Sequence, residues 1–370
     1  MGALHVAISV LCGSTGGPAT YGKRLVAALA ARDDVRITVL TDEPAAFASD
    51  HIAIEHLPMR GGLDRLRWQF AALPRALRRL RPDVYHDTKN ALPFALRVPA
   101  VVTVHDLAYH TVPESFGFGS RTFLRWATKH AVRRAQGVIV PSQATANDLR
   151  RVHPECAGRI HVVPHGIDPA ATFAPEQLAA VRARLRLPER FVLHVGTIQA
   201  RKNVDLVVDG VALLRQRGFS QRTVVVGRKG WLAAKALHAL ERDPTALWLE
   251  HVSGDDLAAI YALADAFVSP SAYEGFGFAV ADAMAAGVPT VISDISSLPE
   301  LCGQGAVRLA SLSAVAVADA LASLLADPAR QSALIAAARQ RAASFSWAAA
   351  AEGHRRVFAA AAANTLRATR

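Results

Sequence analysis

Short apolar runs alternate with stretches of helical periodicity along the whole chain. The apolar runs have the length of strands, and turn residues bound them; examples are Leu4 to Val10, Phe191 to Val195 and Ala266 to Val268. Such runs are typical of strands that are buried on both faces, as in a parallel sheet. Because helical stretches separate the runs, the pattern predicts an α/β fold of strand–helix–strand units.

Both halves of the chain repeat the same plan of strand, glycine turn and helix. A length of 370 residues predicts about two domains. We expect an N-terminal domain over residues 1–172 and a C-terminal domain over residues 173–347, each Rossmann-like, with ligands bound in a cleft between them.

The stretch Ser269–Pro299 contains a strand, a glycine-rich turn, a helix and a second strand. Glycines in the turn Gly275-Phe276-Gly277 let the backbone approach a ligand closely, and the free N–H groups at the helix start suit a phosphate. Glu274 precedes the turn and Asp282 lies one turn into the helix, and each carboxylate can accept hydrogen bonds from hydroxyl groups. The combination fits a sugar nucleotide. The alternative is a solvated Glu at a helix start and an ordinary helix Asp.

Two adjacent cations follow a strand in the second half. The strand Phe191–Val195 leads into Gly196 and then into Arg201-Lys202, and we expect Asn203 to cap the next helix. Arg can bind a phosphate through two hydrogen bonds, and Lys binds it as a point charge. We therefore predict a phosphate clamp that converges with Glu274 on one ligand. The alternative is a pair of surface cations.

A histidine ends a strand in the first half. The run Ala100–Val104 is followed by His105-Asp106. The carboxyl ends of strands in open α/β sheets are the places where ligands bind. Asp106 either orients His105 or caps the next segment. The alternative is a core histidine whose hydrogen bonds are satisfied within the protein.

Taken together, these motifs resemble the retaining GT-B glycosyltransferases of the bacterial group 1 family. The segment Glu274–Asp282 resembles the E-x7-E signature of that family, with Asp282 in place of the second Glu, and the match continues through Ala283–Pro289 and Ser296–Glu300. The resemblance covers nearly the whole chain. It implies the GT-B fold, with two Rossmann-like domains facing across a cleft and a C-terminal helix, at about 348–370, that packs back on the first domain.

The resemblance also implies roles for particular residues. It places His105, Arg201, Lys202 and Glu274 in the catalytic site, with the two cations on the leaving diphosphate. We further expect contacts to the acceptor from Lys89, Asn90, Asp106 and Tyr109. The implied donor-binding set is Gly16, Gly17, Gly196, Arg201, Lys202, His251, Val252, Glu274, Gly275, Phe276, Gly277 and Asp282.

The implied reaction is transfer of a hexosyl group, with mannosyl as one option, from a GDP- or UDP-linked sugar. The acceptor is a glycan, a lipid-linked molecule or a small molecule, the anomeric configuration is retained, and neither metal nor cofactor is required. The sequence contains no Asp-x-Asp motif. Two alternatives stay open: a non-catalytic sugar-nucleotide-binding protein, and an NAD-dependent oxidoreductase of similar architecture. The first glycine loop, Gly13 to Gly17, lacks the G-x-G-x-x-G spacing of the latter.

The net charge of +11 points to an anionic partner or to the base composition of the genome. The sequence carries no nucleic-acid-binding signature. A basic amphipathic stretch, Leu63 to Leu80, predicts either docking to an anionic membrane surface or a helix that packs by its leucines, and we favour the second. We expect Pro74 to start a new helix or to kink this one.

Three well-separated cysteines, Cys12, Cys156 and Cys302, indicate buried thiols in a reducing compartment rather than disulfides or a zinc site. No apolar run reaches the length of a membrane-spanning helix, and the N-terminal sequence lacks the basic region of a signal peptide. We therefore expect a cytoplasmic protein, with the inner face of the membrane as an alternative location.

Overall fold

The computed structural model describes residues 3–11, 17–47, 49–58 and 67–368. The chain divides into two units, which are described separately. The first unit comprises residues 1–107, 118–166 and 346–370, and the second comprises residues 108–117 and 167–345. The chain thus passes to the second unit a few residues before the predicted boundary at 172. The segment Ala108–Gly117, which follows the strand with His105, belongs to the second unit, which the sequence did not indicate.

The described part of the first unit contains one seven-stranded sheet in which every pairing is parallel. The strand order is β3-β2-β1-β4-β5-β6-β7, so the order reverses direction between β1 and β4. Ligands of open α/β sheets bind at such a switch point. The strands are β1 (Leu4–Val10), β2 (Val35–Thr41), β3 (Ile52–His56), β4 (Val84–Asp87), β5 (Ala100–Thr103), β6 (Gly137–Val140) and β7 (Ile160–Val162).

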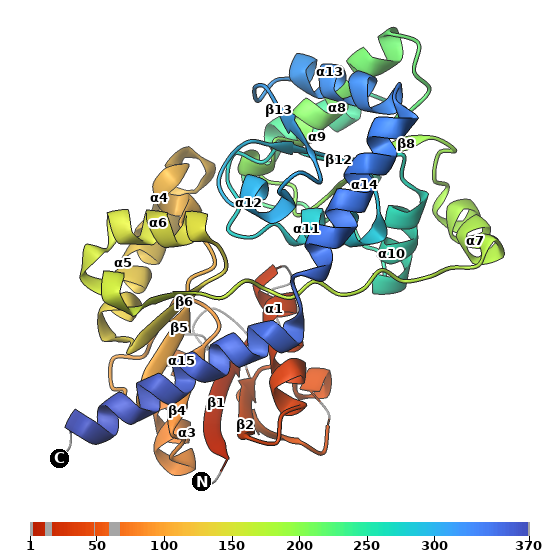
Figure 1. The fold of residues 1–370 in the computed structure, drawn as a ribbon. Helices are drawn as coiled ribbons and strands as arrows, with labels where there is room; N and C mark the ends of the chain where they lie inside the picture. The colour runs from red at the N-terminus through yellow and green to blue at the C-terminus, as the bar shows by residue number, and fades with distance from the viewer. Residues whose placement is uncertain (1–2, 12–16, 48, 59–66, 369–370) are drawn as a thin grey trace. The chain divides into compact units, whose positions relative to one another are not determined.

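The helices of the first unit lie on both faces of its sheet (Figure 1). The last helix of the chain packs against α1 and against β4, β5 and β6. The helical segments are α1 (Gly17–Ala30), η1 (Pro44–Phe47), η2 (Trp68–Ala72), α3 (Leu73–Leu80), α5 (Phe118–Arg134), α6 (Gln143–Val152), η4 (Pro154–Arg159) and α15 (Trp347–Ala368).

The described part of the second unit repeats this plan with a six-stranded parallel sheet of order β10-β9-β8-β11-β12-β13. Its switch point lies between β8 and β11. The strands are β8 (Phe191–Val195), β9 (Arg222–Val226), β10 (Leu247–Leu249), β11 (Ala266–Ser269), β12 (Thr290–Ser293) and β13 (Val307–Leu309).

Helices cover both faces of the second sheet as well. Alternate strand residues explain this: Phe191 and Leu193 belong to one core cluster, whereas Val192 belongs to the other. The helical segments are α4 (Ala108–Thr111), η3 (Pro113–Ser115), α7 (Pro175–Leu185), η5 (Ala200–Lys202), α8 (Val204–Gln216), α9 (Ala234–Arg242), α10 (Gly254–Leu263), α11 (Phe278–Ala286), α12 (Leu298–Cys302), α13 (Ala314–Leu325) and α14 (Pro328–Ala343).

The α/β class and the two Rossmann-like units are as predicted, and a cleft between the units stays a prediction. Within the basic stretch, Pro74 stands at the start of α3, which follows a π-helical turn, and Leu73 and Leu77 are buried. The first residues of that stretch, 63–66, lie outside the described residues. Cys156 and Cys302 are buried free thiols, as expected, and Cys12 lies outside the described residues.

Candidate active site

Two cations and one carboxylate meet at the switch point of the second sheet. Arg201 and Lys202 lie in η5, after β8, and Glu274 lies in the loop after β11. Arg201 Nη1 is 3.2 Å from Glu274 Oε2, and Lys202 Nζ contacts Glu274 Oε1. The side chains are 9–13% exposed. The cation pair and the Glu274 loop therefore lie together, and their binding of one common ligand stays a prediction.

Backbone contacts hold the two loops together. The Ala272 N–H donates to the Arg201 carbonyl at 2.8 Å, and the Arg201 guanidinium donates to the Tyr273 carbonyl at 2.6 Å. Asn203 adopts a left-handed backbone (φ 50°) and donates through Nδ2 to the Pro270 carbonyl at 2.8 Å. Asn203 is the N-cap residue of α8, as predicted, but its side chain makes no capping hydrogen bond and ties the η5 loop to the β11 loop instead.

Serines after β12 fix the backbone of Glu274. The Glu274 N–H donates to Ser296 Oγ at 2.8 Å, and the Ser297 hydroxyl donates to the Glu274 carbonyl at 2.9 Å. Because hydrogen bonds hold both the N–H and the carbonyl group of Glu274, the backbone of this loop fixes the position of the carboxylate next to the cations.

The Glu274 carboxylate stays ionised although it is buried. Burial alone would raise its pKa, but the charges of Lys202 and Arg201, with hydrogen bonds from Lys202 and Ser271, outweigh burial and lower the pKa to about 2. Two cations and one anion leave this cluster with one net positive charge at neutral pH. The cluster can therefore attract a further anion.

A histidine that the sequence analysis missed lies beside this cluster. His194, on β8, is buried, and its Nδ1 donates to the Val268 carbonyl at 2.9 Å. Its Nε2 has no hydrogen-bond partner among the described residues and therefore carries a lone pair. Burial, together with the charge of the neighbouring Lys202, lowers the pKa of His194 to about 4. A polar residue within an otherwise apolar strand was the available signal.

Glycines open the space around the cations. A Cβ on Gly196, which has φ +151°, would lie 3.7 Å from Lys202 Nζ and 3.9 Å from His194 Nε2. Gly277 stands at the N-cap of α11 with φ +100°, and a Cβ there would lie 2.7 Å from Leu298 Cδ2. The turn Gly275-Phe276-Gly277 thus needs glycine at its last position because of the backbone angle and the nearby Leu298, and its approach to a ligand stays a prediction.

The remaining predicted donor contacts differ in exposure. Asp282 is exposed on α11, and its charge is one of the causes that raise the pKa of the buried Tyr261 hydroxyl, after burial itself. His251 accepts a hydrogen bond from Arg228 at 3.2 Å, and Val252 packs against the core. Both lie after β10, which ends at Leu249.

In the first unit, His105 lies after β5, at the carboxyl edge of the sheet. Its Nε2 is 2.8 Å from the Thr88 carbonyl, so Nε2 carries the proton and Nδ1 is left as an acceptor. Burial lowers the pKa of His105, which favours this neutral form. The ring packs edge-on against Tyr21 at 4.9 Å and lies 5.5 Å from the ring of His165.

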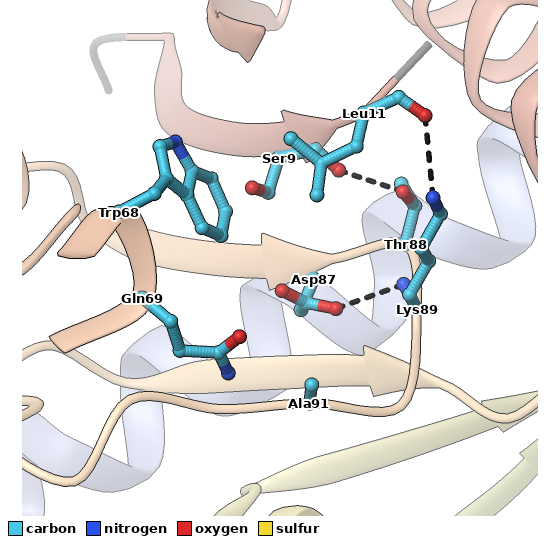
Figure 2. A pocket seen from close by; sticks show the side chains of 8 residues that line it. All are labelled: Ser9, Leu11, Trp68, Gln69, Asp87, Thr88, Lys89 and Ala91. Atoms are coloured by element: carbon cyan, nitrogen blue, oxygen red, sulfur yellow. Dashed lines mark hydrogen bonds between the residues drawn. The ribbon is translucent and has the colours of Figure 1, made fainter. Parts of the chain in front are cut away.

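A small hollow lies at the switch point of the first sheet, between the ends of β1 and β4 (Figure 2). Burial raises the pKa of the Asp87 carboxyl there to about 7, although Tyr85 and the Lys89 N–H donate to it. Lys89 reaches across with its ammonium to the Leu11 carbonyl at 3.3 Å, as Figure 2 shows. The lining residues are Ser9, Leu11, Trp68, Gln69, Asp87, Thr88, Lys89 and Ala91.

The predicted acceptor residues have different surroundings. Asn90 donates to Thr128 of α5, and Asp106 is half-buried next to His105. Tyr109 lies in α4, which belongs to the second unit. It is buried and packs against Phe116, so its ring is not presented to solvent. Gly17 begins α1, and Gly16 lies outside the described residues.

The described part of the chain lacks two features. No three His, Cys, Asp or Glu side chains lie together as metal ligands would among the residues that the structure describes. Among the same residues, no helix has both the length and the apolar character needed to cross a bilayer.

Two protein families match the chain. The family described as "Glycosyl transferases group 1" matches residues 180–341, which contain the Arg201, Lys202 and Glu274 cluster. The family described as "Glycosyltransferase Family 4" matches residues 15–171, which contain His105. The two matches together span most of the chain.

The curated relatives share less than a third of their aligned residues with this chain. The chain is 29% identical over 236 residues to the O-antigen chain mannosyltransferase B of Escherichia coli, over 62% of this chain and 61% of that protein. It is 31% identical over 242 residues to the D-inositol 3-phosphate glycosyltransferase of Salinispora tropica, over 59% of this chain and 50% of that protein. The chain thus spans less than two thirds of the length of these curated relatives.

A solved structure shares the fold over nearly the full length. The Anabaena protein HepE, in complex with UDP and glucose, superposes with a TM-score of 0.78 at 18% identity, over 96% of this chain and 99% of that one. The two doubly wound parallel units are therefore those of a GT-B fold.

Proposed function

Because the chain belongs to the group 1 glycosyltransferase family, we propose that it transfers a hexosyl group from a nucleoside diphosphate sugar to an acceptor hydroxyl with retention of configuration. The acceptor is a glycan, a lipid-linked molecule or a small molecule. One relative is a mannosyltransferase, and a structural neighbour holds UDP and glucose. A nucleoside-diphosphate mannose and UDP-glucose are therefore the first donors to test.

The observation that carries the proposal is the buried cluster of Arg201, Lys202 and Glu274. A diphosphate that leaves the sugar gains negative charge, and preorganised cations stabilise that charge most where water is excluded. Here both cations are already held in place by Glu274 and by the β11 loop, so little reorganisation is needed when the charge develops.

Glu274 serves the sugar as well as the cations. An ionised carboxylate accepts hydrogen bonds only, so it selects for hydroxyl groups and against a second phosphate at the same spot. The backbone N–H groups at the start of α11 lie directly after it and are suited to the phosphate. Asp282, one helical turn further, is our candidate for the ribose hydroxyls.

Retention and independence from metal are part of the proposal. In a front-face reaction the leaving phosphate deprotonates the acceptor hydroxyl, so no enzymatic nucleophile is required. Arg201 and Lys202 would supply the positive charge that a divalent metal supplies in other transferases. His105 would accept a hydrogen bond from the donor sugar through Nδ1, since Nε2 already donates to the Thr88 carbonyl.

The test combines binding with turnover. A panel of nucleotides and nucleotide sugars is screened by thermal shift, because a ligand that binds only the folded state raises its stability. With the best donor, transfer or donor hydrolysis is measured for wild type, Lys202→Met and the matched control Lys235→Met, whose lysine is exposed on α9. We expect Lys202→Met to lose about a hundredfold or more in kcat and the control to keep wild-type rates.

Two further measurements separate the parts of the proposal. NMR of the product reports whether the anomeric configuration of the donor is kept, and the assay is repeated in EDTA. Tight binding of a nucleotide sugar without any turnover would favour the non-catalytic alternative. Equal rates in the two lysine variants would remove the cation cluster from the mechanism.

A further inference from the structure

Helix α5 presents its large residues to solvent and its small ones to the core. The residues that it buries are Ala127, Thr128, Ala131 and Val132. Its largest apolar side chains are instead exposed: Phe118 by 77%, Phe123 by 45% and Trp126 by 48%. A helix that packs on a sheet normally does the reverse, because burial of a large apolar side chain stabilises the fold more.

Two of these exposed rings, Phe123 and Trp126, lie next to each other, and the ring of Phe94 from a neighbouring loop lies next to Trp126. Phe94 is 47% exposed, and its ring lies 5.5 Å from that of Trp126 and 4.4 Å from that of His130. Trp126 in turn lies 6.2 Å from Phe123. We call Phe94, Phe118, Phe123 and Trp126 the aromatic patch. Exposed apolar patches on soluble domains mark surfaces that bind something.

The helix under this patch is strongly basic. Its 17 residues include Arg121, Arg125, Lys129, Arg133 and Arg134 and no Asp or Glu. Lys129 and Arg134 are exposed, and so is Arg97, which follows Phe94 in the loop. The guanidinium of Arg121 lies over the Phe118 ring, 5.8 Å from its centre. An ion pair with Glu155, at 3.2 Å, engages Arg133.

Three occupants can be weighed by their chemistry. A second copy of the chain would bring two rows of cations together, and like charges oppose that contact. A carbohydrate would stack on the rings, but α5 offers no carboxylate to accept hydrogen bonds from its hydroxyl groups. An anionic bilayer satisfies both features, since its interface takes up Trp and Phe rings while its phosphates attract Lys and Arg.

We propose that the aromatic patch and the cations of α5 form a docking surface for an anionic lipid membrane. Helix α5 packs against β5 and η4 with its other face, so it can lie flat on a bilayer without leaving the sheet (Figure 1). The rings enter the interfacial region, and the cations stay at the level of the phosphates. This surface differs from the basic stretch Leu63–Leu80 considered from the sequence, and it does not depend on the transfer activity.

The experiment is flotation of the full chain with lipid vesicles. Vesicles of phosphatidylcholine with phosphatidylglycerol are compared with pure phosphatidylcholine, at low and at high salt. Because the Debye length shrinks from about 30 Å at 0.01 M to about 3 Å at 1 M salt, the electrostatic part is lost at high salt. We expect wild type to float with anionic vesicles at low salt only.

Two variants locate the surface. Phe118→Ser/Trp126→Ser removes two rings, and we expect at least a tenfold loss of vesicle binding with an unchanged thermal transition. Lys129→Glu/Arg134→Glu removes two cations and adds two anions, and we expect a larger loss, since each cation near the surface is worth about fivefold. Trp231→Ser is the matched control: that ring is 47% exposed in the second unit, and its indole N–H donates to the Ser115 carbonyl.

The opposite results are equally clear. Equal flotation with neutral and anionic vesicles, no flotation of wild type, or full flotation of either double variant would overturn the proposal. So would loss of transfer to a water-soluble acceptor in Phe118→Ser/Trp126→Ser with vesicle binding intact, which would make the patch a platform for the acceptor. Because flotation needs no turnover, failure of the proposed enzymatic function would leave this result standing.

Discussion

Glu274 is an ionised carboxylate in a site that excludes most water, and it depends on Arg201 and Lys202 to remain so. The dependence is mutual, because a buried cation that loses its partner costs several kcal/mol. The residue therefore has a structural and a chemical role at once. A substitution of similar shape can separate the two.

Glu274→Gln keeps the size of the side chain and removes its charge. The cluster then carries two net positive charges, so we expect the affinity for a free nucleoside diphosphate to stay equal or to rise. Transfer should nevertheless fall about a hundredfold or more, because an amide cannot replace the carboxylate toward the sugar hydroxyls. Calorimetry measures the first effect and steady-state kinetics the second. A parallel loss of nucleotide affinity would show that Glu274 acts only as a scaffold.

Asp282→Ala tests an exposed member of the proposed donor contacts. The side chain is exposed on α11, so its loss should leave the thermal transition within about 1 °C of wild type. If it binds the ribose equally in the ground and transition states, KM for the donor rises and kcat is unchanged. Initial rates over a range of donor concentrations decide this. An unchanged KM would count against the ribose contact.

At the scale of elements, the backbone of the loops decides what the side chains can reach. The η5 loop and the β11 loop are joined through Asn203 and Arg201, and α11 starts at a glycine with positive φ. Local sequence predicted the strands, the glycine turns and the cation pair, since these follow from periodicity and residue type. It did not predict the role of Asn203, because a bond to Pro270 is a long-range contact that a capping rule cannot contain.

Long-range contacts also explain the other differences between the predicted and the observed structure. His194 stands in an apolar strand, and its bond to the Val268 carbonyl of β11 is a long-range contact. Tyr109 was expected to contact the acceptor, yet it is buried in α4, and the segment that contains it is bonded to the distant Trp231 through Ser115. The sequence also did not predict which face of α5 is exposed. Large apolar residues normally mark the buried face of a helix, but α5 packs on the sheet through its small residues.

Gly277→Ala tests whether the N-terminus of α11 requires its glycine. An L-residue at φ +100° is strained, and the added Cβ would lie 2.7 Å from Leu298 Cδ2. We expect about 2 kcal/mol or more of destabilisation and a loss of nucleotide-induced thermal shift. Gly254→Ala, at the start of α10, is the control, because a Cβ there meets nothing within 4 Å. It should be neutral or slightly stabilising. Equal transitions in both variants would contradict this account.

At the scale of the whole molecule, both units bury neutral histidines. In the first unit, a chain of hydrogen bonds runs from His86 through Thr103 and Tyr21 to His354, at 2.9, 2.8 and 2.7 Å. His354 Nδ1 donates to the Ala350 carbonyl, so its Nε2 must accept from Tyr21. Burial lowers the pKa of His354 to about 4 and that of His194, in the second unit, to about 4 as well.

These histidines make stability depend on pH in a defined direction. Their pKa in the folded state lies below the usual 6.5, so the unfolded chain binds more protons between about pH 6.5 and 4. The free energy of unfolding is therefore constant above this window and falls as the pH drops through it, by up to about 1.4 kcal/mol per pH unit for each group. Protonation of His354 would turn Nε2 from an acceptor of the Tyr21 hydroxyl into a donor and would place a charge among buried groups, which would loosen α15 from the first unit.

The measurement is the slope of the unfolding free energy against pH, taken by urea titration between pH 7 and 4. His354→Gln lowers stability at every pH, but it removes one of the titrating groups, so its slope in the acid window should be shallower than that of wild type. His238→Gln changes an exposed side chain on α9 and should keep the wild-type slope. Parallel curves for wild type and His354→Gln would mean that other groups drive acid unfolding, and α15 would then not be held by a neutral imidazole.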